Sequence, residues 1–133
     1  GDAKWFLEKG AAYAKERVIF GNPIGKNQGV QFPLAKAYAH MIAAEAIVYR
    51  AAGLYDDGFD PGVEANSAKM LAADASWEAA EACLQTHGGF GFAEEYDVER
   101  KFREARLYQV APISTNLILC FIAERVLGLP KSY

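Results

Sequence analysis

Three glycines lie within four positions after a stretch of helical pattern, at Gly88, Gly89 and Gly91. Because glycine has no Cβ, the backbone at these positions can come close to a flat, polar ligand. The side-chain amide of Gln85 falls where the preceding helix should end and could grip such a ligand. A helix C-cap followed by a tight turn explains the same glycines without any ligand. The glycines by themselves therefore leave both interpretations open.

A second candidate site lies near the N-terminus, where an arginine and an aromatic ring are three positions apart. Arg17 and Phe20 continue a helical pattern, so we expect both side chains to project from one face at a helix end. A guanidinium is a planar fork for phosphate oxygens, and a phenyl ring is a flat surface for an aromatic ring system. The spacing by itself favours a plainer interpretation, in which the arginine forms a surface ion pair and the ring belongs to the core.

Polar residues mark the start of the last helical pattern, at Ser114, Thr115 and Asn116. The first N–H groups of a helix have no partner within the helix, and its dipole is positive at that end, so such a terminus suits a pyrophosphate. The same side chains can simply cap the helix. The two roles are compatible.

Patterns typical of other chemistry are missing from the sequence. No cysteine–histidine set has the spacing of a zinc site, and no dinucleotide fingerprint follows a strand. We expect His40 on a helix surface, whereas His87 precedes the glycines and could line a site. Cys83 and Cys120 lie in apolar helical runs, which predicts two buried thiols rather than a disulfide.

Length and composition predict a single globular domain. The chain has 133 residues, of which 52% are hydrophobic and 23% charged. A net charge of −3 gives no general attraction to nucleic acid or to an anionic membrane surface. No apolar run approaches the roughly 20 residues of a membrane span. The chain begins without Met, which we interpret as a piece of a longer protein.

Helical periodicity runs through almost the whole chain. We expect helices over residues 3–20, 32–53, 63–86, 98–107 and 114–127, separated by clusters of turn-forming residues. The predicted packing face of the second helix consists of Phe32, Ala35, Ala39, Ile42, Ala46, Tyr49 and Gly53. On the third helix, a predicted stripe of small residues consists of Ala65, Ala68, Ala72, Ala75, Ala79 and Ala82. Small side chains allow close approach of a neighbouring helix.

The fourth and shortest of these helices is densely charged. Its spacing predicts ion pairs between Glu99 and Arg103 and between Arg100 and Glu104. The expected fold is all-α: an antiparallel up-down four-helix bundle with this short helix in the last crossover.

Two separated sequence elements resemble the C-terminal helical domain of the acyl-CoA dehydrogenase family. The family carries Q-x-x-G-G-x-G-[FY], then V-E-R and R-[DE]-A, which match Gln85–Phe92, Val98–Arg100 and Arg103–Ala105. An upstream family element matches Tyr13–Gly21, followed by Pro23, Ile24 and Gln28. The resemblance extends over roughly Gly1 to Leu127, with both elements in the family's order and spacing.

The resemblance implies an enzyme that uses FAD to convert an acyl-CoA thioester to its α,β-enoyl form and passes the electrons to an electron-transferring flavoprotein. The residues that match the family's FAD contacts are Arg17, Phe20, Gln28, Gln85, Gly88, Gly89, Ser114 and Asn116. Several of these contact a cofactor bound mainly by a neighbouring subunit, so the resemblance implies a homodimer or homotetramer. It also implies a location in the cytoplasm, or in the mitochondrial matrix of a eukaryote.

One position departs from the family pattern. Pro112 stands where many members carry the catalytic glutamate, and Ala111 where an aromatic residue is common. Some relatives place that glutamate on the helix that enters the region, so we expect the base upstream of Gly1. Residues 1–133 would then be a C-terminal domain, inactive by itself, that lacks the N-terminal helical and middle β-domains.

Three alternatives remain open from the sequence. The full protein could be an acyl-CoA oxidase, which would differ in the oxygen reactivity of the reduced flavin. It could be a relative that performs no dehydrogenation, given Pro112. The chain could also be a helical module for oligomerisation that needs no flavin, although a pure scaffold requires neither Arg17 and Phe20 nor the glycines after Gln85.

Overall fold

A computed structural model describes residues 1–132 of the chain. In chain order, its elements are α1 (Asp2–Glu16), β1 (Val18–Ile19), β2 (Asn22–Pro23), the 3₁₀ turn η1 (Ile24–Lys26), α2 (Gln28–Asp56), α3 (Gly62–His87), the 3₁₀ turns η2 (Gly88–Phe92) and η3 (Glu94–Tyr96), α4 (Val98–Leu107) and α5 (Thr115–Arg125). The predicted all-α bundle is confirmed, and the only strands in the described residues form one two-residue hairpin.

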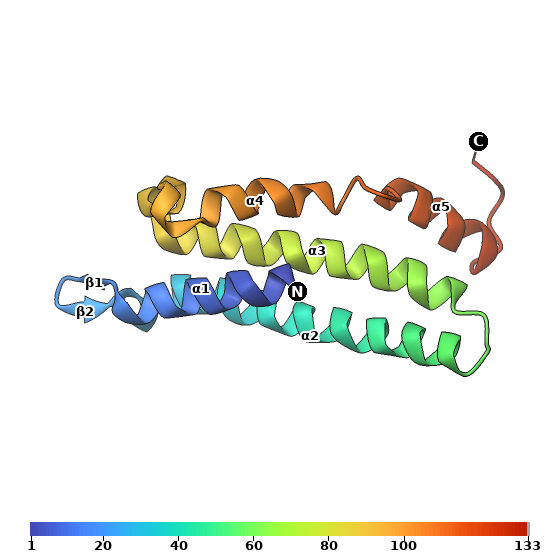
Figure 1. Cartoon of the computed structure of the whole chain (residues 1–133), viewed down its shortest axis with the longest axis horizontal. Coiled ribbons are helices and arrows are strands. Elements are labelled where there is room, and N and C mark those ends of the chain that lie inside the picture. The colour runs from blue at the N-terminus through green and yellow to red at the C-terminus, as the bar shows by residue number, and fades with distance from the viewer. Residues whose placement is uncertain (133) are drawn as a thin grey trace.

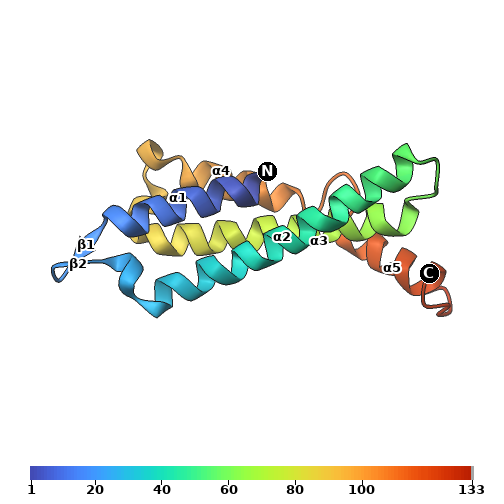
Figure 2. The same ribbon diagram turned by 90° about the horizontal axis from the view of Figure 1, so that it is seen from below.

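The helices alternate in direction along one long axis. Figure 1 shows α2 running back along α1, α3 returning along α2, and α4 and α5 following one another along α3. The same order is visible from below in Figure 2. The contact between α2 and α3 is the most extensive in the bundle, and α1 packs on both helices. The short helix α4 therefore lies along α3 and shares the fourth position of the bundle with α5.

The helices differ in length, and this leaves one half of the bundle without α1. At 1.5 Å per residue, α2 is about 43 Å long and α1 about 22 Å. The N-terminus of α1 lies near the middle of the molecule, and its C-terminus leads to the β1–β2 hairpin at one end (Figure 1). The half beyond the start of α1 is occupied by α2, α3 and α5.

Small side chains on α3 allow its neighbours to approach closely. Ala79, Ala80 and Cys83 of α3 are fully buried, against Phe6 of α1 and Val98 of α4, which are also fully buried. The predicted alanine stripe is confirmed at four of its positions, which are Ala68, Ala75, Ala79 and Ala82, whereas Ala65 is exposed and Ala72 half-buried.

The predicted packing face of α2 is wrong. The residues of α2 that are buried in the bundle are Ala37, Ala44 and Ala51, one heptad apart, whereas Phe32 is 60% exposed and Tyr49 70% exposed. Both sides of α2 carry apolar residues at helical spacing. Periodicity finds an apolar stripe, but it cannot say which of two stripes packs within the same chain. Ala37, Ala44 and Ala51 face the interior, with Leu34 and Met41 packed against the core, whereas Phe32, Ile42 and Tyr49 face outward.

The predicted extent of the first helix is also wrong. α1 ends at Glu16, and Arg17 is in an extended conformation. Val18 and Ile19 then pair with Asn22 and Pro23 in the hairpin. β-branched residues favour a strand over a helix, and the chain reverses too sharply for the helical pattern to continue.

Candidate functional site

The glycine turn and the Arg17–Phe20 segment meet at one end of the bundle. The β1–β2 hairpin projects from this end, and η2, which contains the glycines, lies at the same end, where α3 stops (Figure 1). The guanidinium carbon of Arg17 lies 5.4 Å from the ring centroid of Phe90. The Arg17 side chain is exposed, and no carboxylate among residues 1–132 pairs with it. Its positive charge is therefore available to an external anion.

Phe20 lies at the tip of the hairpin, not on a helix face beside Arg17 as predicted. Its backbone φ is 51° and that of Gly21 is 76°, the signs that a two-residue type I′ hairpin turn requires. A positive φ is common for glycine or asparagine but costs an aromatic residue about 1–2 kcal/mol. The Phe20 side chain is also 100% exposed. A large ring that is both strained and fully exposed indicates a contact outside the described chain.

The glycines after α3 form a capped 3₁₀ turn with an open outer side. The Gly88 N–H donates to the carbonyl groups of Leu84 and Gln85, which ends α3, and its φ is 58°. A Cβ on Gly88 or Gly89 would meet no atom within 4 Å. A Cβ on Gly91 would lie 2.8 Å from a methyl carbon of Leu84. The helix-cap interpretation is therefore correct, and the first two glycines additionally leave bare backbone facing outward.

His87 is buried beneath this turn and does not line an open site. Its Nδ1–H donates to the carbonyl oxygen of Cys83 at 2.8 Å, and only 4% of the residue is exposed. Its ring stacks on Tyr13 at 4.2 Å and meets the edge of Tyr96 at 5.6 Å. Burial lowers the pKa of His87, because the charged imidazolium is poorly solvated there. The aromatic packing around His87 escaped prediction, because it joins residues from α1, α3 and η3.

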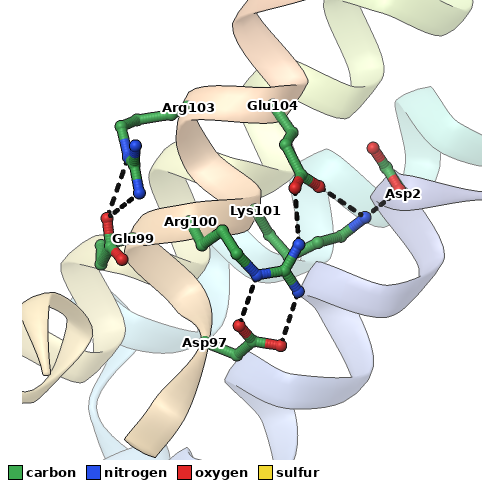
Figure 3. Close-up of polar contacts among 7 residues, drawn as sticks. All are labelled: Asp2, Asp97, Glu99, Arg100, Lys101, Arg103 and Glu104. Carbon is green, nitrogen blue, oxygen red and sulfur yellow. Dashed lines mark hydrogen bonds and ion pairs between the residues drawn. The ribbon is translucent and has the colours of Figure 1, made fainter. Parts of the chain in front are cut away.

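Ion pairs along α4 follow the predicted spacing (Figure 3). Arg103 pairs with Glu99 at 2.9 Å and Arg100 with Glu104 at 2.5 Å, which confirms both predicted pairs. Arg100 also binds both carboxylate oxygens of Asp97 at 2.7 Å. Since these side chains are mostly solvent-exposed, such pairs contribute little to stability.

A further ion pair joins α4 to the first residue of α1. Lys101 Nζ lies 2.7 Å from Asp2 Oδ1, and each side chain is only 18% exposed. Figure 3 shows the Lys101 side chain reaching from α4 to Asp2. The Asp2 carboxylate raises the pKa of Lys101. This pair fixes α4 against α1 and so helps to place the turns that precede α4.

The two glutamines lie at the hairpin end of the bundle, whereas the polar residues of α5 lie apart from it. Gln28 is the first residue of α2, which the sequence predicted to start near Phe32. Gln85 lines a groove of about 730 Å³ between α2 and α3. Ser114 caps α5, accepting the Leu117 N–H at 3.4 Å, and α5 begins far along the long axis from the hairpin (Figure 1). Asn116 is exposed in the first turn of α5.

The segment between α4 and α5 borders a second cavity. Pro112 and Ala111 line this cavity of about 760 Å³ together with the first residues of α1 and with small side chains of α3. Two polar atoms at its wall are buried without a hydrogen-bond partner among the described residues, Ser76 Oγ and Asp2 Oδ2. Ser76 was not singled out from the sequence, where its only signal is a hydroxyl within an alanine-rich helix face.

Two other kinds of feature are absent from the described residues. Within residues 1–132, no helix is both long and apolar enough to cross a bilayer. The same residues contain no group of three or more His, Cys, Asp or Glu side chains placed to hold a metal ion.

We predict that alanine is tolerated at one glycine of the turn and not at another. Gly91→Ala should destabilise the fold by about 1–3 kcal/mol, because the new methyl group would press on Leu84. Gly89→Ala is the matched control and should change the free energy of unfolding by less than about 0.5 kcal/mol. Denaturant titration of both variants measures the difference. Equal effects would contradict the packing described for the turn.

We predict that the stability of the fold decreases as the pH falls below about 6.5. His87 binds a proton less readily in the folded state than in the unfolded state, whose pKa is near 6.5. The unfolded state therefore gains protons first as the pH drops, and the full stability is present only above that value. Thermal unfolding measured from roughly pH 5 to roughly pH 8, the range in which histidine titrates, should show this slope. His87→Phe should reduce it; an unchanged slope in that variant would rule out His87 as the cause.

Comparison with known proteins identifies the family. Residues 1–127 match the model of the C-terminal domain of acyl-CoA dehydrogenases. The chain is 40% identical to the acyl-CoA dehydrogenase FadE12 of Mycobacterium tuberculosis, over 100% of the chain and 35% of that protein. It is 36% identical to the caffeyl-CoA reductase-Etf complex subunit CarC of Acetobacterium woodii, over 83% of the chain and 29% of that protein.

Solved structures give the same result. The butyryl-CoA dehydrogenase of Megasphaera elsdenii superimposes with a TM-score of 0.91 at 32% identity, covering 95% of this chain and 33% of that one. A glutaryl-coenzyme A dehydrogenase in complex with glutaryl-CoA has the same TM-score and identity and covers 98% of this chain and 33% of that one. The chain thus spans about a third of the length of the curated relatives it matches. The chain belongs to the acyl-CoA dehydrogenase family, and it corresponds to the C-terminal domain of that family.

Proposed function

We propose that the full protein is an FAD-dependent acyl-CoA dehydrogenase and that this domain supplies cofactor contacts and a subunit interface. One observation carries the proposal: the unpaired guanidinium of Arg17, the strained and exposed ring of Phe20 and the open backbone at Gly88–Gly89 lie at the same end of the bundle. A dinucleotide needs a cation for its phosphates, a flat surface for its rings and close backbone approach.

The groove beside Gln85 extends this fit. Its volume of about 730 Å³ is in the range of small-molecule sites, and Phe32 and Lys36 of α2 form its opposite side. We assign Gln28, Gln85, Gly88 and Gly89 to the same cofactor contact as Arg17 and Phe20. The space outside the backbone of Gly88 and Gly89 is open. A ligand that lies against this backbone would be within reach of the Gln85 amide.

The distance between the hairpin end and the start of α5 supports a cofactor shared between subunits. Ser114 and Asn116 offer a hydroxyl and an amide at a helix N-terminus, a second place where the cofactor would be held. These residues lie far from Arg17 along the bundle, so we assign the two places to two cofactors, each held by two chains. A homodimer or homotetramer satisfies this requirement. The outward apolar face of α2 offers a surface for subunit contact.

The proposed reaction begins with removal of the α-proton of an acyl-CoA thioester, which the thioester makes acidic, by a carboxylate. FAD, when bound, supplies the acceptor for the β-hydride. Pro112 cannot take a proton, so we place the base upstream of Gly1. The cavity beside Pro112 supports this placement, because Gly1 and Asp2 belong to its wall and lie next in sequence to the proposed position of the base. A full-length sequence without a glutamate there would contradict it.

The remaining parts of the proposal rest on the family. We propose that electrons pass to an electron-transferring flavoprotein, in keeping with the Etf complex to which CarC belongs. We also propose a location in the cytoplasm, or in the mitochondrial matrix of a eukaryote.

We predict that acyl-CoA thioesters bleach the flavin of the full-length protein. Anaerobic addition of a panel that differs in chain length and branching should reduce the flavin with at least one member, since the proposed reaction transfers a hydride to it. Rapid reoxidation by air would identify an oxidase instead. If no member of the panel bleaches the flavin, the proposed reaction is wrong, whether or not FAD binds.

We predict that Arg17→Ala and Gly89→Val each weaken FAD binding about tenfold, because a charged hydrogen bond is worth roughly 1.5–3 kcal/mol and a valine would block the open backbone. The ratio of flavin to protein after gel filtration measures the loss. Gly29→Ala is the control, since a Cβ on Gly29 also meets no atom within 4 Å and this glycine is not among the assigned contacts. Full flavin content in both test variants would refute the contact.

We predict that Phe20→Asn stabilises the hairpin while weakening FAD binding. Asparagine tolerates a positive φ, so the variant should gain up to about 1 kcal/mol in the apoprotein. The aromatic surface for the cofactor would be lost at the same time. Phe59→Asn is the matched control, an exposed aromatic residue in the loop between α2 and α3 at the other end of the bundle. Thermal unfolding of the apoprotein measures its stability, and titration measures its affinity for FAD. Only Phe20→Asn should raise the stability while lowering the affinity.

A further inference from the structure

A continuous series of ring contacts runs from the buried end of α3 to the exposed guanidinium of Arg17. The ring of Tyr13 stacks on His87 with 23° between the planes, and His87 meets the edge of Tyr96. Tyr96 in turn contacts Phe90 at 5.6 Å between centroids, and Phe90 carries Arg17 over its face at 5.4 Å. The series joins α1, α3, η2 and η3 at the hairpin end of the bundle.

His87 occupies the centre of this series. Its ring is in contact with Tyr13 on one side and Tyr96 on another, and its orientation is fixed by the hydrogen bond to the carbonyl group of Cys83, itself fully buried. It is also the last residue of α3, directly before Gly88. One side chain therefore supports both the start of the glycine turn and the rings that reach Arg17.

We propose that His87 is a positioning residue for the cofactor contact: its ring holds Tyr96 and Phe90 in place, and through them it holds the Arg17 guanidinium beside the open backbone of Gly88–Gly89. This inference rests on the proposed function, because it explains how Arg17 is held in position for the proposed contact with FAD.

The physical reason is the conformational freedom of arginine. Arg17 is exposed and extended, and without a ring beneath it the long side chain would sample many rotamers. A ligand that binds a mobile side chain must supply the ordering free energy, which lowers its affinity. Phe90 is 45% exposed, so its own position depends on contacts such as the one with Tyr96. The buried imidazole anchors the series at its other end.

A double-mutant cycle on the full-length flavoprotein tests this inference. The dissociation constant of FAD is measured by titrating the apoprotein of the wild type, His87→Leu, Arg17→Ala and the double variant. Each single change should weaken binding about tenfold, and the double variant should be only about 10–20-fold weaker than the wild type, because His87 acts through Arg17. A purely structural role of His87 would instead give independent losses of about 100-fold in the double variant.

Two more variants keep the test valid if His87→Leu fails to fold. Phe90→Leu removes the ring under Arg17 at a half-exposed position and should weaken FAD binding about threefold, but have no effect in the Arg17→Ala background. His87→Phe keeps an aromatic ring against Tyr13 and Tyr96 and should restore FAD affinity to within about threefold of the wild type. Phe6→Leu is the control for loss of stability in the core and should leave the affinity unchanged, because the ring contact of Phe6 is with Trp5 and not with a ring of the series.

The outcomes separate the inference from the function on which it rests. Independent losses in the cycle, or undiminished FAD affinity in His87→Leu, would overturn the positioning role while leaving Arg17 as a cofactor contact. If Arg17→Ala itself binds FAD as tightly as the wild type, the proposed contact fails, and the inference fails with it. Coupled losses together with rescue by His87→Phe would support both.

Discussion

The close approach of the helices to α3 is the constraint on which the rest of the structure depends. The buried residues of this helix are mostly alanines, so α1, α2 and α4 can all lie against it with little volume between the backbones. Bulk comes from single large side chains such as Phe6 and Val98, placed where the helices meet. Because α1, α2 and α4 all pack against α3, its C-terminus holds the turn at Gly88 in a defined position.

The hairpin end combines this rigid interior with an outer surface that is unfavourable for the isolated chain. His87, Tyr13 and Tyr96 fill the interior, whereas Phe20 carries a positive φ and full exposure at the tip. Backbone strain and full exposure of an aromatic ring both cost free energy in the isolated chain, and a partner outside the chain that contacts the ring would account for both. The same reasoning applies to the outer face of α2, whose larger apolar residues point away from α3. The domain therefore carries its strain and its exposed apolar surface where we propose contact with cofactor and subunit.

Under the proposed function, ligand binding and proton transfer fall to different parts of the protein. The described residues offer a cation, open backbone and helix-capping polar groups, all suited to holding a ligand. At the position where the family commonly carries its carboxylate, Pro112 offers no titratable group. The cavity between Pro112 and the first residues of α1 is where we propose that a residue from elsewhere supplies the base. In this proposal the cofactor contacts at the hairpin end and at α5 do not depend on where the base lies.

The sequence by itself determined the helices, their ion pairs and the order of the elements, because these depend on spacings of three and four residues. The pairs of Arg100 and Arg103 and the cap at Ser114 are examples, each formed within one turn of helix. Only the tertiary structure decided which stripe of α2 packs inward and that Phe20 leaves the helix for a hairpin. It alone brought His87, between Tyr13 and Tyr96, into a series of rings that ends at Arg17. These features depend on contacts between residues distant in the chain, and local spacing does not encode them, since the same apolar stripe can face the interior of its own chain or a partner.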